Sequence, residues 1–416
     1  MAPIERVAIR DGRFILADTG RPFVPLGVNY CRVGDLGDGK PGHATFAPRF
    51  YDQAFVERML ADIAARGLNT VRTFHIYYVG AEGILLSPEA REISPAYLSN
   101  VVHFLREARQ HGIHVIFTWD IWLPSSEWWS STPLPDEERY DLRPEWDQSM
   151  GINNIRLCLP AVRTRANAIV ALIEGVKQIA PDLLSVVLAW ELENEICFAA
   201  DQMPFSARAR TFRFAGRDYD LSSDDEKQAL MDAVTVQWVD CCARAIRRAD
   251  PKALVSADVY AFAAVGRLGP GSLSRDTTAD TRVPARPLAL VRSSVDYVDI
   301  HLYAWRSDSE SQGESFARML ASDEWDTLRV EASRLGKPIL CGECGVAAHY
   351  LRKPDGAIDH AMGVECLAKH VRNIRDAGFA GALYWHYGNP DSTPDEEQPP
   401  MVLFPQYGDA LRALWP

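Results

Sequence analysis

The chain has 416 residues, of which 47% are hydrophobic and 24% are charged, and this composition is ordinary for a globular protein with a large core. The formal net charge of -12 argues against nucleic acid as a partner, because phosphate contacts need clustered Lys and Arg. No stretch approaches the roughly 20 apolar residues of a membrane span, so we expect no membrane partner.

Residues 1–22 contain Asp-Gly and Thr-Gly turns between alternating runs, and this pattern predicts an N-terminal β-hairpin. Short apolar segments follow at intervals, and each is a candidate strand. Their residues are 23–30, 69–76, 114–120, 185–193, 254–262, 297–303, 338–343 and 382–387. Several are apolar at both parities, as is typical of parallel strands that are covered on both faces.

Helical periodicity fills the segments between these strands. It predicts helices over residues 51–67, 96–112, 165–180, 225–249, 314–335 and 361–377. Several of them end at a glycine that supplies the left-handed cap conformation, at Gly67, Gly112, Gly336 and Gly378. Residues 210–221 predict a second hairpin.

The alternation of eight strands with helices predicts a closed α/β barrel of the (β/α)8 type. No GxGxxG follows the first strand, which counts against a dinucleotide-binding fold. We expect one domain over residues 1–416, with the hairpin of residues 1–22 capping the barrel floor. Long βα loops are expected at residues 121–146, 267–287 and 388–408, on the rim that holds the active site in such barrels.

The eight cysteines are scattered through apolar segments, which indicates buried free thiols rather than a disulfide framework. The CxxC pair of Cys341 and Cys344 lacks the second pair that a four-cysteine zinc site needs, so we expect neither a metal nor another cofactor. The chain as given starts without the apolar core of a signal peptide, and a cytoplasmic location is expected. The sequence leaves the oligomeric state open.

Polar and aromatic residues gather near the predicted carboxyl ends of six strands, which face the mouth of a barrel. They are Arg72, His75, Trp119, Asp120, Asn194, Glu195, His301, Tyr303, Glu343 and Trp385. Each alone fits core packing, but the joint pattern favours a functional site because unpaired buried charge is costly. Two carboxylates on well-separated strands meet the requirement of glycoside hydrolysis, in which one donates a proton and the other attacks the anomeric carbon or activates water.

Loop tryptophans offer flat apolar faces on which sugar rings pack. The candidates for such subsites are Trp122, Trp128, Trp129 and Trp305. For the first three, a small core within the loop is a nearly equal alternative.

The strand motifs resemble glycoside hydrolase family 5, within the clan of (β/α)8 retaining glycosidases. AWELENE (189–195) is similar to the strand-four motif of the family's β-mannanases, and VDIHLY (298–303) is similar to its strand-six His-x-Tyr. NTVRTF (69–74), KPILCGECG (337–345) and GALYWHYG (381–388) resemble its strands two, seven and eight. The sequence departs from the family at Ile196, where proline is usual.

The resemblance implies a retaining β-glycoside hydrolase that works by double displacement, with Glu195 as acid/base and Glu343 as nucleophile. It implies that Asn194 binds the sugar 2-hydroxyl and that Arg72 and Tyr303 keep the nucleophile ionised. It also implies supporting roles for the remaining strand-end residues, His301 orienting the acid/base and Trp385 flooring the −1 subsite, beside His75, Trp119 and Asp120.

The expected substrate is a short β-linked oligosaccharide, with β-mannosides ahead of β-glucosides and cello-oligosaccharides. A catalytically silent sugar-binding barrel is an alternative of another class, and a metal-dependent barrel enzyme is a third. For that third alternative, strands five and six offer only Asp258, Asp296 and Asp299, at strand starts or interiors. The sugar at −1, the linkage and the choice of exo or endo action stay open.

Three glutamates at the end of strand four share one parity, and simple alternation would turn all of them inward unless a bulge near Asn194 breaks the register. We expect Glu191, the deepest, to pair with a basic residue of the barrel. We expect the charge of Glu193 to raise the pKa of Glu195 and so to keep this acid protonated near neutral pH.

Overall fold

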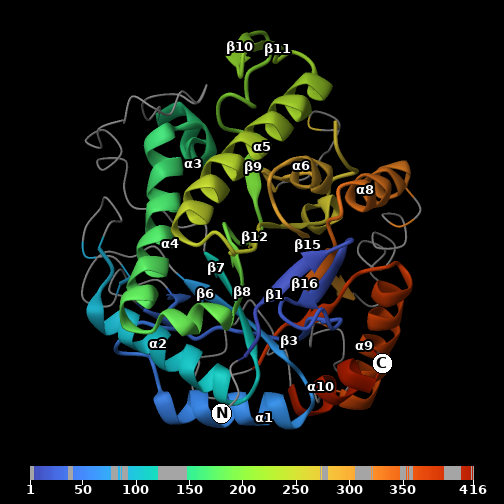
Figure 1. Ribbon diagram of the computed structural model, residues 1–416. Coiled ribbons are helices and arrows are strands. Elements are labelled where there is room, and N and C mark those ends of the chain that lie inside the picture. Colours follow the sequence, from blue (N-terminus) through green and yellow to red (C-terminus); the bar gives the residue numbers. More distant parts are fainter. Residues whose placement is uncertain are drawn as a thin grey trace.

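The protein folds as a (β/α)8 barrel, as the sequence predicts, and Figure 1 shows its helices around a central sheet. The computed structural model describes most of the chain. The described residues are 4–35, 41–75, 83, 84, 86, 92–119, 148–271, 273, 280–304, 320, 322–346, 353, 355, 359–387, 404–413 and 415.

The central sheet has nine strand segments, all paired in parallel, in the order β12-β8-β7-β6-β3-β17-β16-β15-β13. Their bounds are Leu26–Tyr30 (β3), Thr70–His75 (β6), His114–Trp119 (β7), Val187–Glu191 (β8), Val255–Ser256 (β12), Asp258–Tyr260 (β13), Val298–Ala304 (β15), Ile339–Val346 (β16) and Ala382–Tyr384 (β17). The end segments β12 and β13 are separated only by Ala257. They are two halves of the fifth strand, and the sheet therefore closes on itself.

A helix follows each barrel strand along the chain. The helices are Gln53–Ala65 (α1), Pro95–Gln110 (α2), Leu159–Ile179 (α4), Asp224–Ala249 (α5), Pro287–Arg292 (α6), Asp323–Arg334 (α8), His360–Asp376 (α9) and Phe404–Ala413 (α10), with the short Asn154–Leu157 (α3) before α4. Short 3-10 helices lie at Gln148–Asn153 (η2), Pro181–Ser185 (η3) and Phe262–Val265 (η4). The predicted cap glycines Gly67, Gly112, Gly336 and Gly378 have φ of 75°, 69°, 64° and 90°, which confirms their left-handed conformation.

Among the described residues, four antiparallel strand pairs lie outside the barrel sheet. The two predicted hairpins are β1 (Val7–Arg10) with β2 (Arg13–Leu16), and β10 (Thr211–Phe214) with β11 (Arg217–Asp220). The other pairs are β4 (Val33–Asp35) with β5 (Pro41–His43), and β9 (Cys197–Ala199) with β14 (Arg282–Pro284). These last two were not predicted, because strands of three residues carry no periodicity.

The N-terminal hairpin lies against the amino ends of the barrel strands. Val7 and Phe14 belong to one buried cluster with floor residues of five strands or their entries: Ile116, Leu188, Ala189, Tyr297, Leu340 and Leu383. The rings of Phe14 and Tyr297 meet edge to face with centroids 5.3 Å apart. The barrel interior is thus apolar at this end. The single domain over residues 1–416 remains a prediction.

The larger core lies between the barrel and its helices, and it contains the outward side chains of the strands. In the described part of the chain, no helix combines the length and the apolarity that crossing a bilayer requires. The cysteines are free thiols, and all are buried except Cys366, which is partly exposed.

Candidate active site

Above the apolar floor, the inward side chains of the barrel are polar and surround Arg72 of β6. Arg72 is fully buried and donates to carboxylates from three other strands, at 2.6 Å to Glu191, 2.7 Å to Glu343 and 2.8 Å to Asp258. It also donates to neutral side-chain oxygens of Asn29, Thr118 and Asn194. Burial alone would lower the pKa of Arg72, but the three carboxylates raise it well above its usual value.

The fourth barrel strand, β8, continues into a bulge where it leaves the barrel. Leu192 donates its N–H to the carbonyl of Ser256 at 2.9 Å, and the next bond on this side runs from Ile196 to the carbonyl of Asp258 at 3.0 Å. Four residues of strand four therefore match two of strand five, so the alternation of side chains breaks here. Glu195, inside the bulge, has a φ of 55°, a left-handed conformation that costs a non-glycine residue about 1–2 kcal/mol.

The bulge sends the three glutamates of strand four to three surroundings. Glu191 points into the barrel, where it pairs with Arg72 and accepts the Tyr297 hydroxyl at 3.1 Å, so the expected basic partner is confirmed. Glu193 points outward instead and pairs with two arginines of the helices that cover the strand, Arg156 of α3 and Arg165 of α4.

The expectation that Glu193 raises the pKa of Glu195 is therefore wrong. The two arginines offset the charge of Glu193. Burial does raise the pKa of the Glu195 carboxyl, but its hydrogen bond to His301 and the charge of that imidazole outweigh burial and hold the pKa below its usual range.

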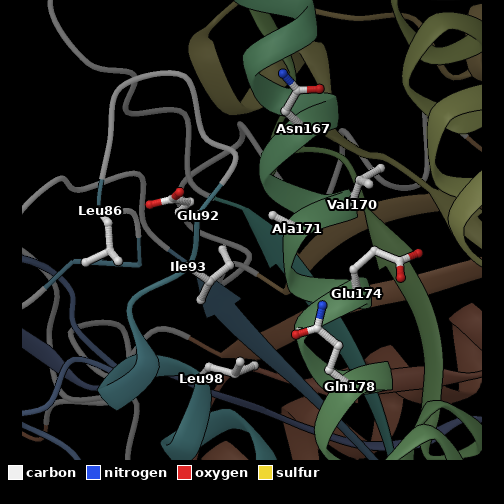
Figure 2. Close-up of a pocket in the computed structure, with 10 residues that line it drawn as sticks. Leu86, Glu92, Ile93, Leu98, Asn167, Val170, Ala171, Glu174 and Gln178 are labelled. Atoms are coloured by element: carbon white, nitrogen blue, oxygen red, sulfur yellow. The ribbon is translucent and has the colours of Figure 1, made fainter.

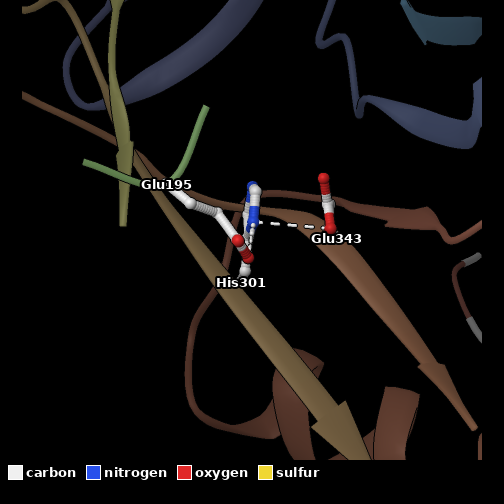
Figure 3. Close-up of side chains that lie close together, drawn as sticks. All are labelled: Glu195, His301 and Glu343. Atoms are coloured by element: carbon white, nitrogen blue, oxygen red, sulfur yellow. Dashed lines mark hydrogen bonds and ion pairs between the residues drawn. The ribbon is translucent and has the colours of Figure 1, made fainter. Parts of the chain in front are cut away.

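Glu195, His301 and Glu343 come together at the carboxyl ends of strands four, six and seven (Figure 3). The imidazole Nδ1 of His301 lies 3.1 Å from Glu195 Oε1 and 3.5 Å from Glu343 Oε2. One oxygen of each carboxylate and one nitrogen of the imidazole lie within 4.8 Å of one another. Within the described ranges, these three residues form the one His, Cys, Asp or Glu group compact enough to hold a metal ion.

The two carboxylates differ in exposure and in partners. The Glu195 side chain is 31% exposed, whereas that of Glu343 is 4% exposed. Glu343 accepts hydrogen bonds from Arg72 on one oxygen and from the Tyr303 hydroxyl on the other. Burial raises the pKa of Glu343 above its usual range, although His301, Arg72 and the Tyr303 hydroxyl act to lower it.

The Nδ1 atom of His301 lies close to both carboxylates, and the pKa of this imidazole is raised. Burial alone would lower the pKa of His301, but the charges of Glu343 and Asp258 and the bond to Glu195 raise it to about 10. A cationic His301 beside an ionised Glu195, and a neutral His301 beside a protonated Glu195, hold the same number of protons. The two groups are therefore linked, and they can share one proton between His301 Nδ1 and Glu195 Oε1, which lie 3.1 Å apart.

Aromatic side chains form a wall beside Glu343. Trp385, 8% exposed, belongs to one cluster with Cys31, Phe74 and Tyr303, and its ring meets that of Phe74 edge to face at 5.5 Å. The predicted tryptophan of strand eight is thus linked to the nucleophile candidate through Tyr303, whose hydroxyl donates to Glu343.

Two predicted site residues lie elsewhere. Since Arg72 and Thr118 point into the barrel, alternation turns His75 and Trp119 outward, into the layer between sheet and helices. His75 is fully buried, and its Nδ1 lies 2.9 Å from the Tyr97 hydroxyl of α2. The ring of Trp119 is fully buried beside it, with centroids 4.9 Å apart. The predicted substrate-binding role of these two residues is therefore corrected to a role in packing.

Other predicted residues lie outside the described part of the chain, namely Asp120, Trp122, Trp128, Trp129 and Trp305. The structure in turn adds Asn29, Thr118 and Asp258 to the site. In the sequence, each of them is a polar residue inside an apolar strand. This pattern alone does not distinguish a site residue from a core residue whose hydrogen bonds are made within the protein.

A cavity of about 560 Å³ lies on the outside of the barrel between α2 and α4 (Figure 2). Leu98 lines it from α2, and Ala171, Glu174 and Gln178 line it from α4. None of the three clustered residues Glu195, His301 and Glu343 lines this cavity, so it is separate from the site at the barrel mouth.

No family model matches the chain, and no curated protein has a matching sequence. Solved structures do match. The endo-1,4-β-mannanase of Rhizomucor miehei is 15% identical, with 98% of each chain covered and a TM-score of 0.56. A glycoside hydrolase family 5 mannosidase of the same organism is 14% identical, over 96% of this chain and 92% of that chain, with a TM-score of 0.57.

An exo-β-1,4-mannosidase of Opitutaceae bacterium strain TAV5 is 19% identical, over 97% of this chain and 58% of that chain, with a TM-score of 0.53. At such identities the likeness shows the fold alone. The barrel is thus similar to that of family 5 mannanases and mannosidases.

Proposed function

We propose that the protein is a retaining β-glycoside hydrolase of family 5, with Glu195 as acid/base and Glu343 as nucleophile. The observation that carries this proposal is the approach of the two carboxylates, whose nearest ligand oxygens lie within 4.8 Å. Retaining enzymes hold their carboxyl groups about 5–5.5 Å apart, whereas inverting enzymes need about 6.5–9.5 Å to admit water. The observed spacing favours the retaining geometry.

In the first step, a carboxylate oxygen of Glu343 attacks the anomeric carbon while the bond to the leaving oxygen breaks. Glu195 gives that oxygen the proton which it shares with His301, and the leaving group departs as an alcohol. Arg72 and Tyr303 each donate to Glu343, and hydrogen bonds to the ionised form keep an attacking carboxylate available. The product of this step is a glycosyl ester of Glu343.

In the second step, water attacks the anomeric carbon, and Glu195 accepts the proton of this water. The ester bond breaks, Glu343 leaves as a carboxylate, and the sugar keeps its original configuration. Asn194 accepts a hydrogen bond from Arg72 on its amide oxygen at 2.8 Å, which leaves its NH2 group to donate to the sugar 2-hydroxyl.

We propose a short β-linked oligosaccharide as substrate, with β-mannosides ahead of β-glucosides. The strand-four motif supports this order, and so do the activities of the similar structures, which are mannanases and mannosidases. Trp385 and Phe74 supply an apolar wall of the kind on which a sugar ring packs.

The test uses aryl β-mannoside, β-glucoside, β-galactoside and β-xyloside with the wild type, Glu195→Ala and Glu343→Ala. We expect Glu343→Ala to lose at least about 1000-fold in kcat, and azide to restore turnover with a glycosyl azide of inverted configuration. Glu195→Ala should lose about 100-fold or more with poor leaving groups. Glu174→Ala, on the outer face of α4, is the control and should keep wild-type rates. Full activity of either active-site variant overturns the assignment.

A metal-dependent barrel hydrolase is the second candidate, because Glu195, His301 and Glu343 also have the spacing of a metal site. Dialysis against a chelator distinguishes the metal-independent glycosidase from the metal-dependent hydrolase. Turnover of an aryl glycoside that survives dialysis against a chelator supports the metal-independent mechanism, and turnover that is lost and then restored by a divalent cation supports the metal enzyme.

A further inference from the structure

Asp258 occupies a central place in the site that the proposed mechanism does not use. It begins β13, it is fully buried, and its two carboxylate oxygens face different partners. Oδ2 accepts from Arg72 at 2.8 Å. Oδ1 accepts the backbone N–H of Glu195 at 2.5 Å and lies 3.3 Å from Nε2 of His301.

These contacts connect Asp258 to both ends of the acid/base. Through the backbone N–H, Asp258 fixes the left-handed peptide from which the Glu195 side chain projects. Through the imidazole, it faces the nitrogen of His301 opposite to the one that meets the Glu195 carboxylate. A carboxylate on one nitrogen of an imidazole favours a proton there and sets the tautomer and the charge of the ring.

The effect of Asp258 on His301 can be distinguished from the effects of the other ionisable groups around this imidazole. Ionisable groups face it from four other strands or their ends, and one lies two residues away on its own strand: Arg72, Glu195, Asp258, Glu343 and Asp299. Glu195 and Glu343 both approach Nδ1, whereas Asp258 approaches Nε2. Among the described ionisable groups, Asp258 alone approaches the nitrogen that the reacting carboxylates do not touch.

We propose that Asp258 is a positioning residue of the acid/base: it holds His301 as a doubly protonated imidazolium and, through His301 and the Glu195 peptide, sets the place and the proton of the Glu195 carboxyl. This inference rests on the proposed function of Glu195. Burial raises the pKa of Asp258 to about 7, although the charges of His301 and Arg72 act to lower it. The charge of Asp258 therefore changes near neutral pH, and it affects the pKa of His301 there.

The variant Asp258→Asn keeps the shape and one acceptor oxygen but removes the charge. Asp299→Asn is the matched control, because Asp299 is equally buried, pairs with Asp258 across the strands and bonds to the Gly342 N–H of β16 instead. Burial and the charge of Glu191 raise the pKa of Asp299 well above its usual value.

The first measurement is the titration of His301 by NMR of 15N-labelled imidazole, with His301→Gln to assign the signal. The wild type should titrate above about pH 8, and Asp258→Asn should lower this value by at least about one unit, with Asp299→Asn close to the wild type. A wild-type His301 that titrates near its ordinary value of about 6.5 overturns the proposal without any variant. So does a value that Asp258→Asn leaves unchanged.

The second measurement compares aryl β-glycosides whose leaving groups need or do not need a proton. Asp258→Asn should lose about 10–100-fold in kcat/KM on the phenyl glycoside, and less than about 3-fold on the 2,4-dinitrophenyl glycoside. Equal losses on both substrates point to a merely structural role and overturn the proposal. Because the NMR measurement needs no turnover, a wild type that hydrolyses no glycoside contradicts the proposed function separately from the role of Asp258.

Discussion

At the scale of single residues, Arg72 explains how so many carboxylates share the inside of one barrel. Its guanidinium bonds to three of them, and each comes from a different strand. A planar fork with five N–H donors serves these three carboxylates together with the oxygens of Asn29, Thr118 and Asn194, which are more partners than the three donors of a lysine ammonium can serve. The carboxylate of Glu343 is thereby held at a fixed place, with its second oxygen left to the Tyr303 hydroxyl.

Tyr303→Phe tests this arrangement through the pH profile. The Tyr303 hydroxyl acts to lower the pKa of Glu343, so its removal raises that pKa. A nucleophile with a higher pKa ionises later, and the acid limb of kcat/KM should move to higher pH by about one unit, with a lower plateau. Tyr51→Phe, which removes a hydroxyl bonded to His103 outside the barrel, is the control. An acid limb that stays in place would contradict the role of Tyr303.

At the scale of elements, the bulge of strand four determines where the glutamates at its end, Glu191, Glu193 and Glu195, point. Its register is held by bonds from both neighbours: Asn194 donates its N–H to the carbonyl of Trp119 at 2.7 Å, and Ile196 donates to that of Asp258 at 3.0 Å. The second bond requires a residue with an N–H at position 196, which isoleucine has and the proline of the similar family 5 motif lacks.

Ile196→Pro should therefore destabilise the protein, although proline stands at this place in the motif that strand four resembles. It removes the bond to Asp258, and proline also restricts the backbone of the preceding residue, which is the left-handed Glu195. We expect a loss of about 2–4 kcal/mol in urea unfolding, together with reduced activity. Ile196→Val keeps the N–H and should cost only about 0.5–1.5 kcal/mol. Similar losses for the two variants would show that the bond does not matter.

The barrel strands also show which features can be predicted from the sequence and which cannot. The barrel strands and long helices follow from periodicity and cap glycines, and their order suffices to place Arg72, Asn194, Glu195, His301, Tyr303, Glu343 and Trp385 at one mouth. Periodicity does not say which parity faces inward when both faces of a strand are apolar. His75 and Trp119 were misplaced for this reason, whereas Glu193 was misread because its two arginines come from helices distant from it in the sequence.

At the scale of the whole molecule, buried ionisable groups lie on both sides of the sheet. Ion pairs occur inside the barrel, around Arg72, and outside it, between Glu193 and the arginines of α3 and α4. Outside it, histidines lie among apolar side chains, and burial lowers the pKa of His75 to about 3 and that of His370 to about 4. With these pKa values, both histidines are neutral in the folded protein at neutral pH, and they gain a proton readily there only when the chain unfolds.

The sign of the resulting pH dependence follows from linkage. Between pH 6.5, the ordinary value, and about 3, the unfolded chain binds a proton at His75 that the folded chain does not bind. Stability therefore falls as the pH drops through this window, by up to about 1.4 kcal/mol per pH unit for this one group, and it is unaffected by His75 above the window.

His75→Asn isolates this contribution, because asparagine presents a polar atom near the place of Nδ1 for the Tyr97 hydroxyl but takes up no proton. The difference in unfolding free energy between wild type and variant should shrink steadily from pH 6.5 to pH 4 and stay constant from pH 7 to pH 9. His111→Asn, at the partly exposed end of α2, should show no comparable slope. A difference that is flat through the acid range would mean that the folded barrel admits the proton to His75, and that the layer between sheet and helices is open to water at this point.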